Sequence, residues 1–244
     1  MKKIYVVGIG PGNEMFMTDE AKLALKESEV VVGYDLYVEL VKNLVEGKIV
    51  ESTPMKKEVD RCKIALEYAL NGQTVSMVCS GDSGVYGMAG IVIEVAKDHP
   101  EVEIKVVAGI TAACSSAAVL GAPLIHDFAI ISLSDLLTPW EKIEKRLRLA
   151  SDADFVICLY NPSSKKRHDY LYKACEQMLL FKSPQTKCGY VKNIGREGET
   201  YQLCTLEELK NRQVDMFTTV IIGNSQTKVI NNKLVTPRGY EIKD

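Results

Sequence analysis

The sequence lacks most of the short motifs by which enzymes are commonly identified. Its 244 residues contain no HExxH segment, no GxSxG turn and no CxxC pair, which argues against zinc proteases, serine hydrolases and zinc-cluster proteins. Only three histidines and one tryptophan occur. No apolar run approaches the length of a membrane-spanning helix, and the N-terminus lacks the apolar core of a signal peptide, so we expect no membrane association.

An excess of charge of one sign is also missing. The formal net charge is −2, so the chain is not predicted to bind polyanions in general and no nucleic-acid partner is expected. The seven cysteines are an odd number and lie far apart, several of them inside apolar runs. We therefore expect reduced, mostly buried thiols in a cytoplasmic protein.

What the chain does contain is an alternation of short β-branched runs and longer amphipathic segments. Strands are predicted at residues 4–9, 29–33, 74–79, 102–107, 128–131, 154–159, 188–191 and 218–222. Helices are predicted from a cap at Thr18 and at residues 58–71, 85–97, 111–120, 139–150, 167–181 and 206–210, with a final hairpin at 228–242. Strands that are apolar on both faces are typical of parallel sheets covered by helices. We predict an α/β fold of two α/β domains, residues 1–122 and 123–244, with a ligand cleft between them.

A glycine-rich turn, GIGPG at residues 8–12, directly follows the first predicted strand. Asn13 stands where a dinucleotide fingerprint requires its third glycine, and Pro11 removes an N–H group that a phosphate cradle would use. The segment therefore disfavours NAD and ATP. It indicates either a tight turn that allows a flat ligand to approach Gly10 and Gly12 closely, or a turn without ligand contact.

Two further turns follow predicted strands of the first half. GDSGVYG at residues 81–87 places Asp82 between small residues at a strand end, where a carboxylate can accept ribose hydroxyls or bind an ammonium group. The alternative is that Asp82 only caps the next helix. GITAA at residues 109–113 could bind a ligand carboxylate through the N–H groups in the first turn of the following helix. Alternatively, its small side chains could simply allow close helix packing.

Polar segments also follow the strands of the second half. They are LYNP at residues 159–162 and NIGREGE at residues 193–199. Arg196 could pair with a substrate carboxylate or with its neighbour Glu197.

Two other polar residues of the second half are candidates for a site. Asp135 lies in SLSDLLTPW at residues 132–140, either as a site residue or as the cap of a turn. His126 is the one histidine that we consider for a site.

The order of GIGPG, GDSGVYG, GITAA and LYNP resembles the tetrapyrrole methyltransferases, which use S-adenosylmethionine. The resemblance extends from about residue 3 to about residue 228. GYDLY, LSDLLTPW, NIGREGE and the TVIIGNSQT segment at residues 219–227 resemble the branch that methylates C17 of precorrin-3B or cobalt-precorrin-3 and contracts the ring, in cobalamin biosynthesis. One departure is Ala108, where the family usually has proline, which loosens the turn but keeps its backbone donors.

The resemblance implies a homodimeric enzyme with a small-molecule tetrapyrrole substrate. No metal ligands are expected, because the sequence has no Cys/His cluster with the spacing of a zinc site. It implies that the cofactor contacts Pro11, Gly81, Asp82, Val85, Tyr86, Thr111, Ala112, Asn161, Gly195, Gly223 and Asn224. Gly10, Gly12 and Arg196 are expected to face the substrate. Because such a substrate carries many carboxylates, a basic rim is needed, for which the candidates are Lys56, Lys57, Lys192, Arg196 and Lys228.

The reaction that the family performs has two chemical steps with different needs. Methyl transfer from a sulfonium is an in-line displacement, for which the enzyme supplies position rather than acid–base chemistry. Ring contraction requires a general base, and the candidates are Asp35, His126 and Asp135, with Asp135 preferred.

Several other functions remain open from the sequence. They are methylation of another tetrapyrrole carbon, a Rossmann-type methyltransferase that uses Asp35 as its ribose ligand, and a binding module without catalysis. Methylation of ribosomal RNA is disfavoured because there is no basic stripe.

Overall fold

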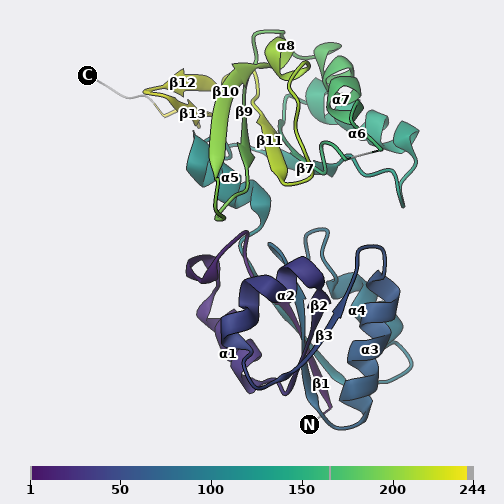
Figure 1. The fold of residues 1–244 in the computed structure, drawn as a ribbon. Coiled ribbons are helices and arrows are strands. Elements are labelled where there is room, and N and C mark those ends of the chain that lie inside the picture. The colour runs from purple at the N-terminus through teal and green to yellow at the C-terminus, as the bar shows by residue number, and fades with distance from the viewer. Residues whose placement is uncertain (1, 165, 241–244) are drawn as a thin grey trace. The chain divides into compact units, whose positions relative to one another are not determined.

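A computed structural model describes residues 2–164 and 166–240 of the chain. The chain divides into two compact units, Met1–Ala112 and Ala113–Asp244. Figure 1 shows that each unit is built around its own β-sheet with helices packed against it. The prediction of an α/β fold is therefore confirmed.

The first unit contains a five-stranded parallel sheet in the order β3-β2-β4-β1-β5. Its strands are β1 (Lys3–Gly8), β2 (Val30–Tyr34), β3 (Ile49–Thr53), β4 (Thr74–Cys79) and β5 (Glu103–Val107). Its helices are α1 (Asp19–Glu27), α2 (Asp35–Val41), α3 (Glu58–Leu70) and α4 (Ala89–Val95), with short 3-10 turns at Glu14–Phe16 and Lys42–Leu44. Because all five strands are parallel, their carboxyl ends meet at one edge, the usual ligand-binding edge of such sheets.

Helices cover both faces of this sheet, as Figure 1 shows for α1 and α2 on one side and α3 and α4 on the other. Alternate residues of β1 serve the two faces. Ile4 and Val6 pack in the cluster that contains buried residues of α3 and α4, whereas Tyr5 and Val7 pack with those of α1 and α2. Burial on both faces explains why β1, β2 and β4 are apolar at most positions.

The second unit contains a mixed sheet in the order β10-β9-β11-β8-β7 and a small sheet in the order β12-β13-β6. Its strands are β6 (Gly121–Ala122), β7 (Phe128–Ser132), β8 (Val156–Tyr160), β9 (Lys187–Lys192), β10 (Thr200–Thr205), β11 (Thr218–Ile222), β12 (Lys228–Ile230) and β13 (Lys233–Val235). Its helices are α5 (Ala112–Leu120), α6 (Trp140–Asp152), α7 (Tyr170–Leu179) and α8 (Leu206–Leu209). Buried residues of α6, α7 and α8 form the main core of this unit against one face of the mixed sheet.

The direction of β11 gives the second sheet two different edges. β11 runs antiparallel to both β8 and β9, with Thr218 opposite Lys192 and Val220 opposite Leu159. One edge, which we call the carboxyl edge, therefore holds the ends of β7, β8 and β9 and the start of β11. The opposite edge holds the starts of β7, β8 and β9 and the end of β11.

The boundary between the units differs from the predicted one, which follows Ala122. The structure divides the chain after Ala112, so that α5 and β6 belong to the second unit. The reason is local contact: the N–H of Ala113 donates to the Tyr160 hydroxyl at 2.7 Å, and β6 pairs with β13. The apolar periodicity of α5 does not reveal which sheet it will join.

Most predicted elements are present with small shifts at their ends. The strands at 74–79 and 218–222 match β4 and β11, and Thr18 caps α1 by accepting from the N–H of Ala21. The helix predicted at 85–97 is shorter, because the residues before Ala89 form turns. The elements α2, β3 and β10 were not predicted.

The cysteines lie as expected. All seven are free thiols, and only Cys114 is exposed. Burial raises the pKa of the Cys79 and Cys158 thiols to about 12, so neither is a nucleophile at neutral pH.

Candidate functional site

The glycine turns at the carboxyl edge of the first sheet are joined through their backbones. Gly10 and Gly81 form an antiparallel bridge, in which the Gly81 N–H donates to the Gly10 carbonyl at 2.7 Å and the reverse bond is 3.1 Å. Both glycines have positive φ, +73° and +69°. A Cβ at Gly10 would stand 2.5 Å from the Phe16 carbonyl oxygen, so this glycine is already required by the turn itself.

Asp82 ties two of these turns together. Its Oδ1 accepts from the Gly84 N–H at 2.8 Å, and its Oδ2 accepts from the Gly109 N–H at 2.9 Å. The second bond links the end of β4 to the loop after β5. Asp82 therefore does not cap α4, which begins at Ala89, and its half-buried carboxylate keeps lone pairs for further donors.

The loops at this edge approach one another too closely for side chains. A Cβ at Gly109 would stand 2.1 Å from the Gly81 carbonyl oxygen, and a Cβ at Gly8 would stand 2.7 Å from the Gly109 nitrogen. The buried Ser83 hydroxyl adds a bond to the Val107 carbonyl at 3.2 Å. Three loops thus form one backbone assembly at the end of β1, β4 and β5.

The remaining candidates of the first unit lie on the same loops. Pro11 and Gly12 are buried in the turn after β1, and Val85 and the exposed Tyr86 follow Asp82. Tyr86 has a φ of +53°, a conformation that L-residues rarely adopt. Thr111 directly precedes α5, and Ala112 is its first residue.

Sequence reasoning missed one residue at this edge, Arg61 of α3, which is 4% exposed. Its Nε donates to the Thr53 hydroxyl at 2.8 Å and its Nη2 donates to the Pro54 carbonyl at 3.3 Å, while its guanidinium lies 5.9 Å from the Tyr34 ring centroid. No carboxylate within the described residues forms an ion pair with it. A buried cation without an acidic partner is unusual in a protein.

In the second unit, Asn161 and Gly195 follow strands that end at the carboxyl edge of the sheet. The Asn161 amide donates to the Ser132 hydroxyl at 2.9 Å, which links the ends of β8 and β7. Asn161 and Gly195 both have positive φ. The Gly195 N–H donates to the Glu199 carboxylate at 2.7 Å.

Arg196 belongs to the same loop as Gly195. Its guanidinium lies 5.8 Å from the Phe217 ring centroid. The structure thus brings Asn161, Gly195 and Arg196 to one edge of the second sheet.

Asp135 lies in the loop after β7, at the carboxyl edge, but it is occupied by other side chains. The Tyr170 hydroxyl donates to it at 2.6 Å, and Arg167 forms an ion pair with it. The hydrogen bond from Tyr170, followed by that from Arg167, lowers the pKa of the Asp135 carboxyl, although desolvation acts in the opposite direction. A paired carboxylate with a lowered pKa is a weaker base, which argues against its predicted role in ring contraction.

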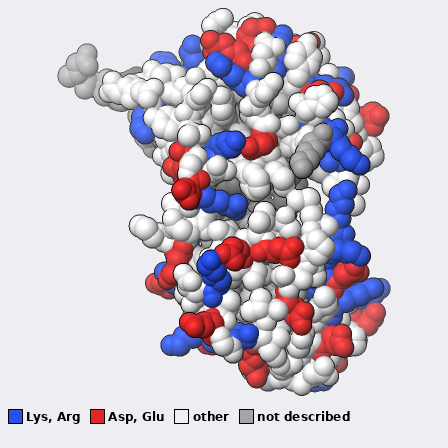
Figure 2. Space-filling view, viewed as in Figure 1, with Lys and Arg blue, Asp and Glu red and all other residues white. Residues whose placement is uncertain are grey.

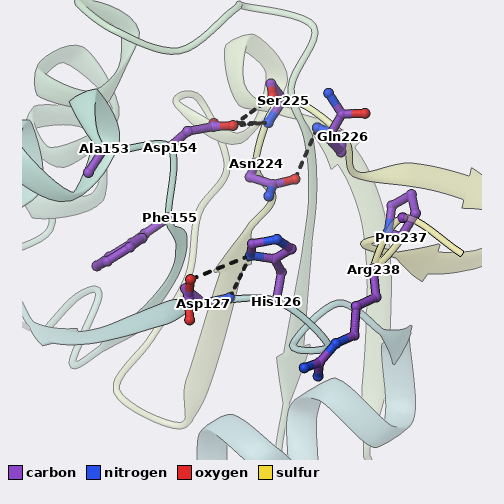
Figure 3. Close-up of a pocket in the computed structure, with 11 residues that line it drawn as sticks. His126, Asp127, Ala153, Asp154, Phe155, Asn224, Ser225, Gln226, Pro237 and Arg238 are labelled. Carbon is purple, nitrogen blue, oxygen red and sulfur yellow. Dashed lines mark hydrogen bonds and ion pairs between the residues drawn. The ribbon is translucent and has the colours of Figure 1, made fainter.

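His126, Gly223 and Asn224 lie at the opposite edge of the second sheet from Asn161 and Gly195, although the resemblance groups Gly223 and Asn224 with those two residues at the cofactor. His126 precedes β7, and Gly223 follows β11, with its N–H bonded to the Lys187 carbonyl at the start of β9. His126 and Asn224 line one pocket of about 460 Å³, shown in Figure 3. Local sequence does not reveal this separation, because it depends on β11 being antiparallel to β8 and β9.

Charges of both signs are intermixed on the faces of the two units seen in Figure 2. Among the predicted rim cations, Lys57 pairs with Asp60 at 2.9 Å and Lys192 pairs with Asp215 at 2.8 Å. Among residues 2–164 and 166–240, no helix is both long and apolar enough to cross a membrane. The same residues contain no group of three or more His, Cys, Asp or Glu side chains arranged to hold a metal ion.

Residues 3–210 match the family model of the tetrapyrrole (corrin/porphyrin) methylases. Among curated proteins, the chain is 48% identical to a probable cobalt-factor III C(17)-methyltransferase of Salmonella typhimurium, covering 97% of this chain and 99% of that protein. It is 39% identical to a precorrin-3B C(17)-methyltransferase of Sinorhizobium sp, covering 97% and 96% of the two chains.

Two solved structures of methyltransferases are also similar to this chain. The methyltransferase CobJ superposes with a TM-score of 0.88 at 37% identity, covering 96% of this chain and 99% of that one. A uroporphyrin-III C-methyltransferase of Thermus thermophilus, complexed with S-adenosylhomocysteine, has a TM-score of 0.75 at 23% identity over 91% and 97% of the chains. The second likeness establishes a shared fold.

Proposed function

Because the chain belongs to the tetrapyrrole (corrin/porphyrin) methylase family, we propose that it transfers a methyl group to C17 of precorrin-3B or of its cobalt-containing counterpart, in cobalamin biosynthesis. The observation that carries this proposal is the likeness to C(17)-methyltransferases over nearly the full length of both chains, at 48% identity for one of them. A binding module without catalysis would not account for this full-length match to enzymes.

The methyl donor that we propose is S-adenosylmethionine, held by the loops at the carboxyl edge of the first sheet. Two observations support this choice: the edge is the usual ligand edge of a parallel sheet, and Asp82 keeps lone pairs beyond those that accept from Gly84 and Gly109. A neighbour of the same fold carries S-adenosylhomocysteine, the product that this donor leaves. When bound, the donor supplies an electrophilic methyl group on a sulfonium sulfur.

The contribution of the chain to methyl transfer is position. The ring carbon forms a new bond to the methyl carbon while the carbon–sulfur bond breaks, and the electron pair stays on sulfur. The bridged glycine loops restrict the backbone at Gly81 and Gly109, which preorganises the edge for a single in-line geometry. No side-chain acid or base is needed at the sulfur.

We propose that Asn161 and Gly195 contribute to binding the adenine of the donor, as the resemblance implies. Both residues have positive φ and follow strands, β8 and β9, that end at the carboxyl edge of the second sheet. Gly223 and Asn224 are not included, because they lie at the opposite edge of the same sheet.

For the carboxylates of the substrate, Arg61 is the strongest candidate of the first unit. Its guanidinium is buried beside the ends of β2 and β3 and has no acidic partner among the described residues. It also stands in the first turn of α3, where the helix dipole disfavours a cation. A substrate carboxylate that pairs with Arg61 would offset both the burial of an unpaired charge and its unfavourable interaction with the helix dipole.

Ring contraction, which the resemblance implies, requires a base for a ring hydroxyl. Asp35 is the candidate that we propose, since it begins α2 directly after β2, at the carboxyl edge of the first sheet. It is exposed, and within the described residues no hydrogen bond or ion pair occupies its carboxylate. Asp135, by contrast, is held by Tyr170 and Arg167.

The resemblance also implies a homodimer, which we propose as the state in solution. Light scattering at micromolar concentration should give about twice the 27.0 kDa mass of one chain. A mass near that of one chain would contradict it.

The reaction is tested with S-adenosylmethionine labelled with ¹³C in its methyl group. The protein is incubated with precorrin-3B and, separately, with the cobalt-containing counterpart, and the product is analysed by mass spectrometry and NMR. We expect S-adenosylhomocysteine to form and the label to appear at C17 with one of the two substrates. A label at another carbon would indicate a methyltransferase that acts at a different ring position. If neither substrate yields S-adenosylhomocysteine, methyl transfer is contradicted.

A further inference from the structure

The pocket at the opposite edge of the second sheet belongs to no part of the proposed reaction. It has a volume of about 460 Å³, within the range of small-molecule sites, and lies entirely within the second unit. Its walls come from the turn before β7, the turn before β8, the turn after β11 and the segment after β13.

The buried amide of Asn224 has a donor that no partner uses. Asn224 is 6% exposed, and its Oδ1 accepts from the Gln226 N–H at 3.0 Å and from the Thr227 hydroxyl at 3.1 Å. These two donors fix the orientation of the amide, so that the NH₂ group is the free end. Within the described residues Nδ2 has no acceptor, although Asn224 lines the pocket. Because Nδ2 is not one of the buried side-chain atoms without a partner in the described chain, it is open to the pocket and can donate to a ligand there.

Two more donors line the same pocket. The Nδ1 of His126 accepts from the Asp127 N–H at 2.9 Å, so the neutral ring carries its proton on Nε2. Arg238 is exposed and has no ion-pair partner in the described chain. In Figure 3 the Asn224 amide is drawn near the His126 ring, whereas the Arg238 side chain, from another wall of the pocket, extends to a guanidinium lower in the view.

The Arg238 segment is anchored to the Asn224 turn. The buried hydroxyls of Thr227 and Thr236 are 2.8 Å apart, and the Thr236 N–H donates to the Ala122 carbonyl at 3.2 Å. Thr236, two residues before Arg238, is therefore linked to Asn224 through the buried Thr227 hydroxyl.

Of the two acidic residues of the pocket, Asp154 is engaged by other groups, whereas Asp127 faces water. The Asp154 carboxylate accepts from the Ser225 hydroxyl at 2.6 Å and the Ser225 N–H at 2.9 Å, and it pairs with the buried Lys182 at 3.3 Å. Asp127 lies 3.7 Å from His126, and its side chain is 79% exposed to water. Among the described residues that line the pocket, the side-chain donors without partners include those of Asn224, His126 and Arg238.

We propose that this pocket is a binding site for a small oxyanion, either a phosphate group or a carboxylate group of a soluble metabolite. Three uncommitted N–H donors, one of them on a cation, match the acceptor oxygens of such a group. The site is separate from methyl transfer, because it lies at the edge of the second sheet opposite to Asn161 and Gly195. The proposal therefore does not rest on the proposed function.

The three histidines of the chain provide a direct test by ¹⁵N–¹H NMR of the imidazole rings at constant pH and ionic strength. Inorganic phosphate and sodium acetate are titrated separately, with sodium chloride as the control for ionic strength. The His126 signals, assigned with His126→Gln, are expected to shift and saturate with at least one of the two anions. The signals of His99 and His168 should not show the same saturation.

Three variants sharpen the test. Arg238→Gln and Asn224→Asp, the second of which keeps the Oδ1 acceptor but loses the donor, should each weaken anion binding about tenfold or more. Arg146→Gln, which removes an exposed cation elsewhere in the second unit, should leave it unchanged. Saturation with phosphate alone assigns a phosphate site, and saturation with acetate alone assigns a carboxylate site. A linear shift with both anions, or equal binding by Arg238→Gln and the wild type, overturns the proposal.

Discussion

The two units of this chain present their polar loops in different ways. In the first, five parallel strands end at one edge, and the loops there are joined by backbone bonds between Gly10 and Gly81 and by Asp82. In the second, the antiparallel strand β11 divides the polar loops between two edges. Parallel strands therefore gather candidate residues by topology alone, whereas in a mixed sheet the direction of each strand must be known first.

The same difference appears in what holds the loops. The first unit uses close backbone contacts that exclude side chains at Gly8 and Gly109. The carboxyl edge of the second unit uses side-chain networks, such as Asp135 with Tyr170 and Arg167. We expect substitutions in the first unit to alter ligand binding and reaction, and substitutions in the Asp135 network to alter mainly stability.

The largest effect is expected from Asp35→Asn, which removes the proposed base. Proton transfer by a positioned side chain contributes about 10²–10⁴-fold to a rate, so ring contraction should slow by that factor while methyl transfer continues. Mass spectrometry and NMR of the product should reveal methylated, uncontracted ring. Glu39→Gln, on the same helix, is the matched control. Contraction at the wild-type rate would place the base elsewhere.

The next effect in size is expected from Asp82→Ala. The substitution removes a carboxylate that accepts from Gly84 and Gly109 and that we propose to contact the donor. Loss of a charge-assisted hydrogen bond costs about 1.5–3 kcal/mol, or about 10–150-fold in affinity for S-adenosylhomocysteine measured by calorimetry. Asp60→Ala, which removes an exposed carboxylate of α3, should leave that affinity unchanged. If a folded Asp82→Ala protein binds as the wild type does, the assignment fails.

Gly109→Ala tests the backbone assembly itself. Because its Cβ would stand 2.1 Å from the Gly81 carbonyl oxygen, the loops after β4 and β5 must separate. Overpacking of this kind costs about 1–3 kcal/mol of unfolding free energy. Thermal unfolding should show a lower midpoint for Gly109→Ala. Gly90→Ala, where a Cβ meets nothing within 4 Å, should be neutral or slightly stabilising, and an equal loss in both variants would refute the close-contact argument.

The smallest effect is expected from Asp135→Asn in the second unit. Removing the charge should lower stability by about 1–2 kcal/mol near neutral pH, less than for fully buried partners because these side chains are partly exposed. Folding lowers the pKa of Asp135. The stabilisation that its carboxylate gives the folded protein is therefore complete above the ordinary carboxyl pKa and is lost as the pH falls through the lowered value.

The melting temperatures of Asp135→Asn and the wild type should therefore differ at pH 5–7 and converge below about pH 4. Asp152→Asn, an exposed site on α6, serves as the control. A difference that grows as the pH falls would contradict this account of the Asp135 pKa.

Local sequence predicted the fold class and many of the strands and helices well. The strands β4 and β11 have the predicted ends, because continuous β-branched runs bounded by turn residues are a local signal. The partners of Asp82 could not be predicted, since Gly109 is distant in sequence and its N–H is brought near only by pairing of β1 with β4 and β5.

Two features of the structure were missed from the sequence, the position of Asn224 and the burial of Arg61. The opposite-edge position of Asn224 follows from the antiparallel direction of β11, which no local pattern encodes. Arg61, by contrast, left a signal: it shares one helical face with the buried Ala65 and Ala69, and a cation on an apolar face indicates a special role.

The central claim is that the methyl donor binds the glycine loops at the carboxyl edge of the first sheet, and a crystal structure of the protein with S-adenosylhomocysteine tests it most directly. We predict electron density for the ligand against the Gly81–Asp82 and Gly109–Thr111 backbones, with a ligand donor within hydrogen-bond distance of the Asp82 carboxylate. Density for the ligand in the pocket of His126 and Asn224, with none at these loops, would contradict the account.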